Sequence, residues 1–475
     1  MGIPVPIPFT GPSYQGRSSA VNTQECINLR HNIDRSGGKS VLSLMGRHCL
    51  EDFSDLGGEP IRGMVEEGNI GYVVSGSRFY SVANDGTAVH KGTLLSSSGN
   101  VGMASNGFDI LICDGADGYN YDIAGASFTT MGGTFLGGDC VTFIDQYFVV
   151  NKPDTGVAQS SGLADGTAWA AADVATAEGD PDNLIRAIAV HGDLWLMGDR
   201  TAEPYFNVNN PTGFPFGRKG QGYIDMGLAA RWSAAVMDNT LYWMAKNREG
   251  HYGICRAAGY TPQKISTPAI DYQINAIAAA GTITDAIAFT FSDEGHSFYV
   301  LTFPTGNKTL VFDAATGLWS EWQSRGLGRF RCQYHMMLTT SHIVGDSQNG
   351  KLYKLKQGIY DDAGITVEKI RTTQFLHKSG REITINSLWV DFESGTGLST
   401  GQGEDPMAML QFSKDQGKTW SNEYWVPIGK IGEYGDRAKW TRLGSAYTWT
   451  FRLKVSDPVK CIIIGAYCEM EVGDD

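Results

Sequence analysis

Long apolar runs are missing from this 475-residue chain. No stretch approaches the ~20 consecutive apolar residues of a membrane-spanning helix, so we expect no membrane-spanning segment. The first residues, MGIPVPIPFTGPSYQG, contain neither a basic region nor an apolar core, and therefore predict no secretion signal. Sustained heptads and long amphipathic helices are also missing, which argues against a coiled coil or a helical bundle.

Patterns that hold metals, phosphates or cofactors are scarce as well. The eight cysteines form no CxxC pair, which is typical of reduced, scattered cysteines in a chain made in a cytoplasm. The nine histidines show neither HxH nor HxxxH spacing, and the glycine-rich stretch at 217–222 lacks the GK[ST] ending of a phosphate loop. We therefore predict no metal and no cofactor.

Positive charge is in short supply. With 38 Lys and Arg against 51 Asp and Glu, the formal net charge is −13. Such a balance argues against a surface that coats nucleic acid, because the phosphate backbone would be repelled. It is compatible with a channel through which DNA slides without sticking.

Turn residues and aromatic residues, in contrast, are abundant. The 60 glycines exceed the usual ~7%, and with 20 Tyr, 21 Phe and 11 Trp they fit an all-β chain with many turns. The stretch Ile70–Leu94 shows the pattern, with three short β-branched and aromatic runs separated by Gly76-Ser77-Arg78 and Asn84-Asp85-Gly86. Asn, Asp and Gly tolerate positive φ, so this stretch predicts a meander of antiparallel strands.

The same pattern of strand, polar turn and aromatic strand recurs along the chain. Further copies follow at 103–121, 141–150, 185–198, 232–244, 286–319 and 329–355. A repeat of about 30–50 residues built this way predicts a β-propeller, because one such sheet cannot bury both faces whereas a ring of sheets can. The repeats carry no WD dipeptide and no kelch glycine pair, so a large sandwich or a β-helix stays open as an alternative.

The predicted fold class is therefore all-β, a β-propeller of six or seven blades with a C-terminal β-sandwich domain. We place an N-terminal arm and ring-closing strands at 1–60, the propeller at 61–365 and the sandwich at 366–475. The prolines at positions 4, 6 and 8 predict an extended arm that is either free or crosses a neighbour. One of two runs, Cys26–Asn32 or Ser40–Leu44, could close the ring.

A few segments depart from the repeat. Asp165–Ala177 and Tyr272–Ala280 are weak helix candidates, while Gly156–Asn183 and Phe206–Gly227 are interpreted as loop insertions, where binding tends to sit. The character changes near Asp361-Asp362, whose carboxylates we expect to be solvated in a turn. The longer strands after this point favour a separate sandwich.

Motifs on both sides of this boundary resemble one family. The run Leu410–Trp420, followed by motifs at 428–429, 432–434, 437, 440 and 442–444, is similar to the end of the tail-hub proteins of short-tailed bacteriophages, also described as packaged-DNA stabilisation proteins. Motifs at 193–198, 203, 215–216, 227, 230–233, 241–243 and 265–266 resemble the middle of that family. The similarity extends over roughly residues 20–470.

This resemblance implies a structural virion protein of the tail, made in the host cytoplasm, and not an enzyme. It implies a nozzle-like homo-oligomeric ring, a hexamer, below the portal-adaptor (head-completion) protein. Such a ring would close the DNA exit channel after packaging, open at DNA ejection, and dock a tail needle, tailspike or fibre. DNA would pass through the channel without sequence-specific binding, and no catalytic residues come with the resemblance.

A rival interpretation starts from the hairpin motif of the same tail segment. Ser413, Asp415, Gly417, Thr419 and Trp420 match the S-x-D-x-G-x-T-W Asp-box that sialidases carry on propeller blades. Its role is structural: Asp caps its own turn, Gly supplies positive φ and Trp packs into the core. A glycosidase would also need paired carboxylates about 5–10 Å apart, or a Tyr nucleophile with an arginine cluster, for which the neighbours Glu433 and Tyr434 are the nearest candidates. A virion-associated glycan-binding protein and a cellular scaffold propeller are further alternatives.

The candidate subunit or partner interface lies in the predicted loop at 206–227. A closed ring needs a heterologous interface, one patch on each chain meeting a different patch on the next. Phe214 and Phe216 are the expected aromatic anchors, and Arg218 and Lys219 the expected partners of a neighbour's carboxylates. A stable ring of about six chains would favour the tail hub, whereas a monomer would favour the alternatives.

Overall fold

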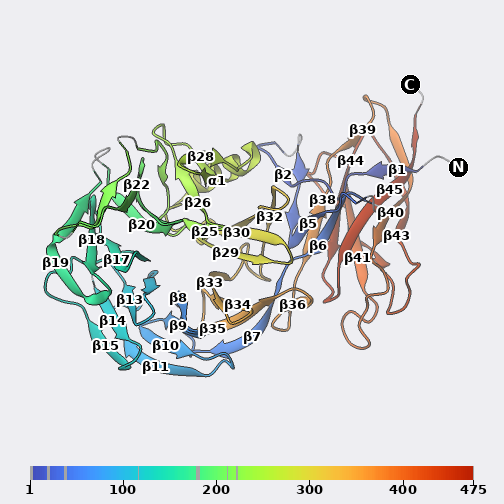
Figure 1. Cartoon of the computed structure of the whole chain (residues 1–475). Helices are drawn as coiled ribbons and strands as arrows, with labels where there is room; N and C mark the ends of the chain where they lie inside the picture. Colours follow the sequence, from blue (N-terminus) through green and yellow to red (C-terminus); the bar gives the residue numbers. More distant parts are fainter. Residues whose placement is uncertain are drawn as a thin grey trace.

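The computed structural model describes residues 4–18, 22–36, 40–115, 117–177, 182–210, 212–220 and 223–473. Within these ranges the chain forms a ring of seven β-sheets and, beside it, a β-sandwich (Figure 1). Both chain ends lie at the sandwich end of the molecule (Figure 1). The structure therefore has the all-β class that the repeats predict, and its described residues contain seven blades.

Each blade is a meander of antiparallel strands. The first three blades comprise β8 (Ile61–Glu67), β9 (Ile70–Ser75), β10 (Arg78–Val82) and β11 (Ala88–Thr93); β12 (Gly102–Ser105), β13 (Asp109–Cys113), β14 (Gly118–Asp122) and β15 (Ser127–Thr130); and β16 (Val141–Ile144), β17 (Tyr147–Asn151), β18 (Val157–Gly162) and β19 (Asp165–Thr176). Blades 4 and 5 comprise β20 (Leu184–Val190), β21 (Asp193–Gly198), β22 (Ala202–Asn207) and β23 (Phe216–Arg218); and β24 (Gly227–Leu228), β25 (Ala235–Met237), β26 (Thr240–Lys246), β27 (Tyr252–Ala258) and β28 (Thr261–Lys264). Blade 6 comprises β29 (Ile287–Asp293), β30 (His296–Phe303), β31 (Lys308–Asp313) and β32 (Leu318–Glu321).

Blade 7 closes the ring with a strand from the other end of the propeller sequence. Its strands β33 (Cys332–Leu338), β34 (Ser341–Asp346) and β35 (Lys351–Lys356) are completed by β7 (Cys49–Asp55), which pairs antiparallel with β35. The closing strand thus follows both runs that we considered for this role. Those two runs contribute β4 (Cys26–Ile27), β5 (Leu29–Ile33) and β6 (Leu42–Gly46), and all three strands join the sandwich sheets.

The tight turns between strands carry the residues that positive φ requires. In the turn between β16 and β17, Asp145 and Gln146 have φ of 48° and 70°, and between β25 and β26 Asp238 and Asn239 have φ of 49° and 56°. Two consecutive positive φ values define the type I′ turn, whose twist matches that of the flanking strands. The polar turn signals of the sequence therefore mark true hairpins.

Two sheets make up the sandwich. One contains β43 (Ala438–Ala446), β40 (Ile383–Phe392), β45 (Ile462–Val472), β6 and β5, with β1 (Val5–Ile7) paired to β45. The other contains β4, β38 (Lys369–Thr372), β44 (Thr448–Val455), β41 (Met407–Ser413) and β42 (Tyr424–Pro427), with β39 (Leu376–His377) beside β44. Two short hairpins, β2 (Tyr14–Gln15) with β3 (Thr23–Gln24) and β36 (Asp361–Asp362) with β37 (Ile365–Thr366), lie outside these sheets.

The structure confirms one of the two predicted helices and shows strands in both predicted loop insertions. The helix candidate near 272–280 is confirmed as α1 (Pro268–Ala280), which begins at the capping residue Thr267. The other candidate is wrong, because 165–176 forms the outer strand β19, and with β18 it fills most of the supposed insertion at 156–183. The supposed loop at 206–227 contains β23, the outer strand of blade 4.

Apolar side chains fill the spaces between neighbouring blades. Trp195, Trp243 and Trp319 are 3%, 0% and 3% exposed, as their place in the strongest strands predicts. The eight cysteines are buried and unpaired. Within the described ranges, no helix has the length and apolar character needed to cross a membrane.

Candidate functional site: the domain junction and the predicted interface

The propeller and the sandwich share one continuous β-sheet. The outermost strand of blade 6, β32, pairs in parallel with β4 at Glu321 and Ile27. On its other side β4 pairs antiparallel with β38 of the sandwich, through Ile27 and Ile370. Because backbone hydrogen bonds cross the boundary, the two domains are joined by more than the covalent linker.

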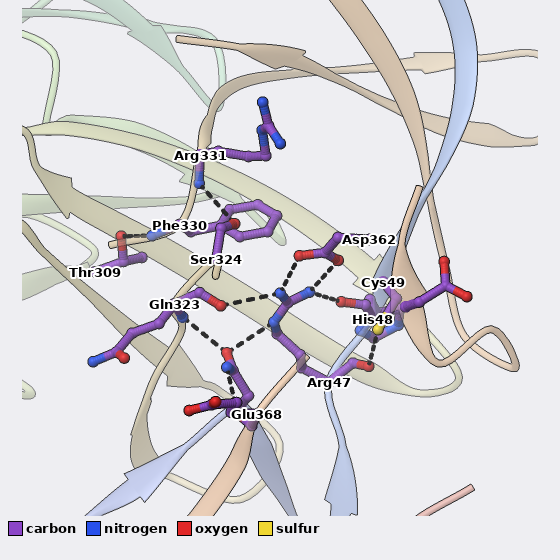
Figure 2. A network of polar contacts seen from close by, with 12 residues as sticks. Arg47, His48, Cys49, Thr309, Gln323, Ser324, Phe330, Arg331, Asp362 and Glu368 are labelled. Carbon is purple, nitrogen blue, oxygen red and sulfur yellow. Dashed lines mark hydrogen bonds and ion pairs between the residues drawn. The ribbon is translucent and has the colours of Figure 1, made fainter. Parts of the chain in front are cut away.

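A buried arginine, Arg47, binds the segments that meet at this boundary (Figure 2). It lies between β6 and β7, and its side chain is completely buried. The guanidinium donates to both carboxylate oxygens of Asp362, with Nη1–Oδ1 at 3.1 Å and Nη2–Oδ2 at 2.6 Å. It also donates to Asn28 Oδ1 at 2.9 Å and to the Gln323 carbonyl at 3.2 Å. One side chain thereby joins Asn28, which links the sandwich strands β4 and β5, to the end of blade 6 and to the β36 hairpin.

The partners of Arg47 are themselves held in place. Asn28 donates through Nδ2 to the Glu368 carbonyl at 2.8 Å and accepts from the Gln323 backbone N–H at 2.8 Å. The Arg47 guanidinium lies 5.0 Å from the ring centre of Phe330. A buried ion pair is costly to break, since one charge is left without its counterion.

The carboxylate of this pair corrects an expectation. Asp362 is 3% exposed and bound to Arg47, and is therefore not a solvated turn charge. The local sequence does not indicate that Asp362 is buried, because its partner Arg47 is 315 positions away. A pairing over that distance has no signal in a single sequence.

The N-terminal arm packs against its own sandwich. β1 pairs with β45, and Phe9 is completely buried in the sandwich core. Arg371, which is fully buried, donates to the carbonyl oxygens of Phe9 at 2.6 Å and Gly11 at 2.7 Å. His31 is hydrogen-bonded to the same Gly11 carbonyl at 3.1 Å, and burial lowers the pKa of this histidine to about 4. The described part of the arm is therefore fixed within the chain.

The Asp-box forms the hairpin between β41 and β42 of the sandwich. Asp415 Oδ1 accepts from the Thr419 backbone N–H at 2.8 Å and from Ser413 Oγ at 2.7 Å, and Oδ2 accepts from Thr419 Oγ1 at 2.6 Å. These hydrogen bonds hold the pKa of Asp415 well below its usual range, and the one from the Thr419 side chain makes the largest contribution. Gly417 has φ of 82°. Trp420 is half-buried, and the guanidinium carbon of Arg452 lies 4.0 Å from the centre of its ring. The expectation that Trp420 packs into the core is therefore wrong.

The predicted interface residues lie on blade 4, and its aromatic pair needs a correction. Phe214 and Phe216 are 7% and 4% exposed and pack between blades 3 and 4, because β23 completes the sheet and turns them inward. They are therefore not free to anchor a neighbour. Arg218 pairs with Glu203 at 3.3 Å, and Lys219, whose side chain is 42% exposed, pairs with Asp193 at 3.1 Å. Sequence reasoning missed this burial because β23 is only three residues long.

The arrangement of carboxylates and tyrosines gives a glycosidase no specific support. Tyr434 is 78% exposed on the loop between β42 and β43. Burial raises the pKa of Asp139, but this carboxylate is bound to Arg231 at 2.6 Å. In the described ranges no group of three or more His, Cys, Asp or Glu side chains could hold a metal ion.

Comparison with known proteins agrees with the two-domain architecture. The family model described as Bacteriophage P22 Gp10, beta-propeller, matches residues 5–360, and the model described as Bacteriophage P22 Gp10, beta-sandwich, matches residues 368–471. No curated protein matches the chain. Among solved structures, the Pan2 WD40 domain of Neurospora crassa is 6% identical with a TM-score of 0.43, and the alignment covers 66% of this chain and 97% of that chain. The WD40 propeller domain of Doa1 is 12% identical with a TM-score of 0.41, covering 63% of this chain and 93% of that chain.

The fold and the two matched models define a structural phage protein of the propeller-plus-sandwich class. The chain belongs to the Bacteriophage P22 Gp10 family, the stabilisation proteins of packaged DNA at the tail hub of short-tailed phages. This confirms the family resemblance and the fold class that the sequence motifs predict.

Proposed function

We propose that this chain is the subunit of a hexameric ring in a short phage tail. The ring attaches below the portal adaptor, closes the DNA exit channel after packaging, and docks the needle, tailspike or fibre proteins. The observation that carries the proposal is that both domains of the family occur in one chain, in order, over residues 5–360 and 368–471. A structural role in the virion accounts for this domain pair without any catalytic group.

The distribution of charge supports a channel that DNA passes without binding. Residues 61–365 contain 20 Lys and Arg against 30 Asp and Glu, whereas residues 366–475 contain 13 against 15. The propeller region thus carries most of the net negative charge. A phosphate backbone is repelled by such a surface, which favours sliding over retention.

The junction supports a role in which the subunit holds a fixed shape under load. The shared sheet and the Arg47–Asp362 pair resist rotation of the sandwich against the propeller. A plug that withstands the pressure of packaged DNA needs such resistance at every domain boundary. Arg218 and Lys219 remain our candidates for a neighbour's carboxylates, now as charged groups without the aromatic anchors.

Two measurements test the proposal. Mass photometry measures the number of copies in the purified chain, both alone and mixed with the purified portal–adaptor assembly. Whether or not the chain forms rings when alone, we expect about six copies of it on the assembly. Phage particles assembled without this chain should package DNA and then lose it, which nuclease protection of the encapsidated DNA measures. Particles that retain their DNA without the chain, or a chain that stays monomeric on the assembly, would overturn the proposal.

A further inference from the structure

Two exposed apolar side chains lie close together at one face of the propeller, in hairpin turns of blades 2 and 3. Phe108, between β12 and β13, is 73% exposed, and Leu163, between β18 and β19, is 61% exposed. Their turns adjoin because Gly166 of β19 lies against β13, where a Cβ added to it would be 3.5 Å from the Asp109 Cβ. Apolar side chains that gather on a surface mark an interaction site, whereas scattered ones do not.

Four carboxylates surround this apolar pair. They lie in or beside the four turns of blades 2 and 3 at this face, and are Asp109, Asp122, Asp145 and Asp165. Neither Lys nor Arg occurs in these turns, which comprise 106–108, 123–126, 145–146 and 163–164. We call Phe108, Leu163 and the four carboxylates the hairpin rim.

The lack of cations extends over the whole face of the propeller. Antiparallel strands alternate in direction, so the first and third turns within a blade lie at the same face. The corresponding turns of the other blades also contain no Lys or Arg, and comprise 68–69, 83–87, 191–192, 208–215, 238–239, 259–260, 294–295, 314–317 and 339–340. Turns at the opposite face, in contrast, contain Lys152, Arg200 and Arg248. Asp is common in turns because it caps them, but capping does not explain the lack of cations.

Positive charge gathers at the tip of the sandwich, on the opposite side of the molecule from blades 2 and 3 (Figure 1). The turns β39–β40, β41–β42 and β43–β44 meet there. Lys414 Nζ donates to the Ser445 carbonyl at 3.1 Å, and Thr448 Oγ1 donates to the Lys414 carbonyl at 3.1 Å. His377, which precedes the first of these turns, pairs with Thr448. We define the sandwich tip by the exposed side chains Lys378, Arg381, Lys414, Lys418 and Tyr447, the last of them 61% exposed.

The four cations of the sandwich tip have no carboxylate partner. Within the described residues, none of them forms an ion pair. Of the carboxylates in the same turns, Asp415 is bound within its own hairpin, Glu423 is bound to a lysine of β44, and Glu382 is exposed. Arg218 and Lys219, in contrast, already bind carboxylates of their own chain.

We propose that the hairpin rim of one copy of this chain binds the sandwich tip of the next copy. This inference rests on the proposed ring and adds which two surfaces hold its subunits together. The rim offers carboxylates without cations, the tip offers cations without carboxylates, and Tyr447 matches the apolar pair Phe108 and Leu163. Because the two surfaces lie on opposite sides of the molecule, they form a heterologous, head-to-tail contact, which a closed ring requires.

Charge reversal on each surface tests the contact. Mass photometry measures the occupancy of the purified portal–adaptor assembly as the chain is titrated. Asp145→Lys on the rim and Arg381→Glu on the tip should each raise the concentration for half-occupancy about tenfold or more. In the combined variant the loss should be smaller than in either single variant, whereas independent sites would multiply to about a hundredfold.

The blades supply a matched control. Asp238→Lys makes the same change in the equivalent turn of blade 5, where Asp238 is exposed and has φ of 49° against 48° for Asp145. It should leave the concentration for half-occupancy unchanged. Phe108→Ala with Leu163→Ala removes the apolar part of the rim and should raise it about fivefold or more. Circular dichroism should show that every variant melts like the wild type, because the altered side chains are exposed.

Three results would overturn the inference while leaving the proposed ring intact. They are full occupancy by Asp145→Lys at wild-type concentrations, an equal loss in Asp238→Lys, and losses that multiply in the combined variant. The last result would show that the rim and the tip bind different partners, such as another tail protein. A wild-type chain that never reaches about six copies would instead refute the proposed ring, and the inference with it.

Discussion

The propeller and the sandwich bury their apolar side chains in different ways. Among the described residues of the propeller, seven separate clusters lie between neighbouring blades, such as the one that joins Trp195 of blade 4 to Trp243 of blade 5. In the sandwich, a single cluster joins both sheets and includes Phe9 of the N-terminal arm. Stability in the propeller is therefore a sum over adjacent units, as in repeat proteins, whereas the sandwich core is one unit.

This difference assigns distinct roles to the junction and to the cores. A substitution between two blades first destabilises those two blades, whereas a substitution in the sandwich core destabilises the whole sandwich domain. The Arg47 network couples the two kinds of domain.

Arg47→Ala should separate the two domains energetically. It leaves the buried carboxylate of Asp362 without its counterion, which we expect to cost about 3–5 kcal/mol. Differential scanning calorimetry should then show two resolved transitions at lower temperature than in the wild type. Arg78→Ala, at the exposed first residue of β10, is the matched control, and a single unshifted transition in Arg47→Ala would refute the coupling.

Trp243→Ala should destabilise the propeller with little effect on the sandwich. Its indole is completely buried between blades 4 and 5 and its Nε1 has no partner within the described residues, so the loss is one of packing. We expect about 3–5 kcal/mol. Chemical denaturation measures it, with Trp425→Ala, a 55% exposed sandwich residue, as a control. Equal stabilities of Trp243→Ala and the wild type would contradict the blade assignment.

Arg371→Leu should loosen the sandwich through the N-terminal arm. The buried carbonyl oxygen of Phe9 loses its donor, which should cost about 1–3 kcal/mol, while the Gly11 carbonyl keeps its hydrogen bond with His31. Limited proteolysis should then cleave the arm before any other described segment. Resistance of the arm equal to that in the wild type would show that β1 alone holds it.

Asp415→Ala should have the smallest effect, and the effect should depend on pH. The pKa of Asp415 is lowered on folding, so its ionised form stabilises the sandwich above about pH 4, and this contribution is lost as the pH falls further. The melting temperature of Asp415→Ala should lie below that of the wild type at pH 7, and the gap should narrow toward pH 2. A gap that stays constant with pH would exclude the carboxylate as its cause, and Asp436→Ala controls for a change of surface charge.

The sequence predicts the blades well because their hairpins are local. Turn residues such as Asp238 and Asn239 lie beside the strands they connect, so a single short stretch of sequence contains the whole hairpin pattern. Strand β19 was missed because its alanines favour a helix in isolation, while pairing with β18 holds the segment extended. Tertiary pairing overrides local preference there.

The junction and the arm could not be predicted, because they depend on partners remote in sequence. Arg371 meets the arm about 360 positions away, and Arg47 meets Asp362 across 315 positions. Pro6 did not prevent β1 from pairing, because β1 adds to β45 as a short edge strand with Pro6 exposed. No local pattern marks any of these contacts.

The closing strand has a consequence for the growing chain on the ribosome. β7 is synthesised before the strands of all seven blades that follow it, but its partner strand β35 comes much later. Lys351 of β35, whose ammonium group donates to the Asp52 carboxylate of β7, lies 299 positions after it. At 5–20 residues per second, β7 waits about 15–60 s before its partner strand exists. A polypeptide that stops before residue 351 cannot complete blade 7. The ring of blades within one chain can therefore close only after the ribosome has translated the whole propeller.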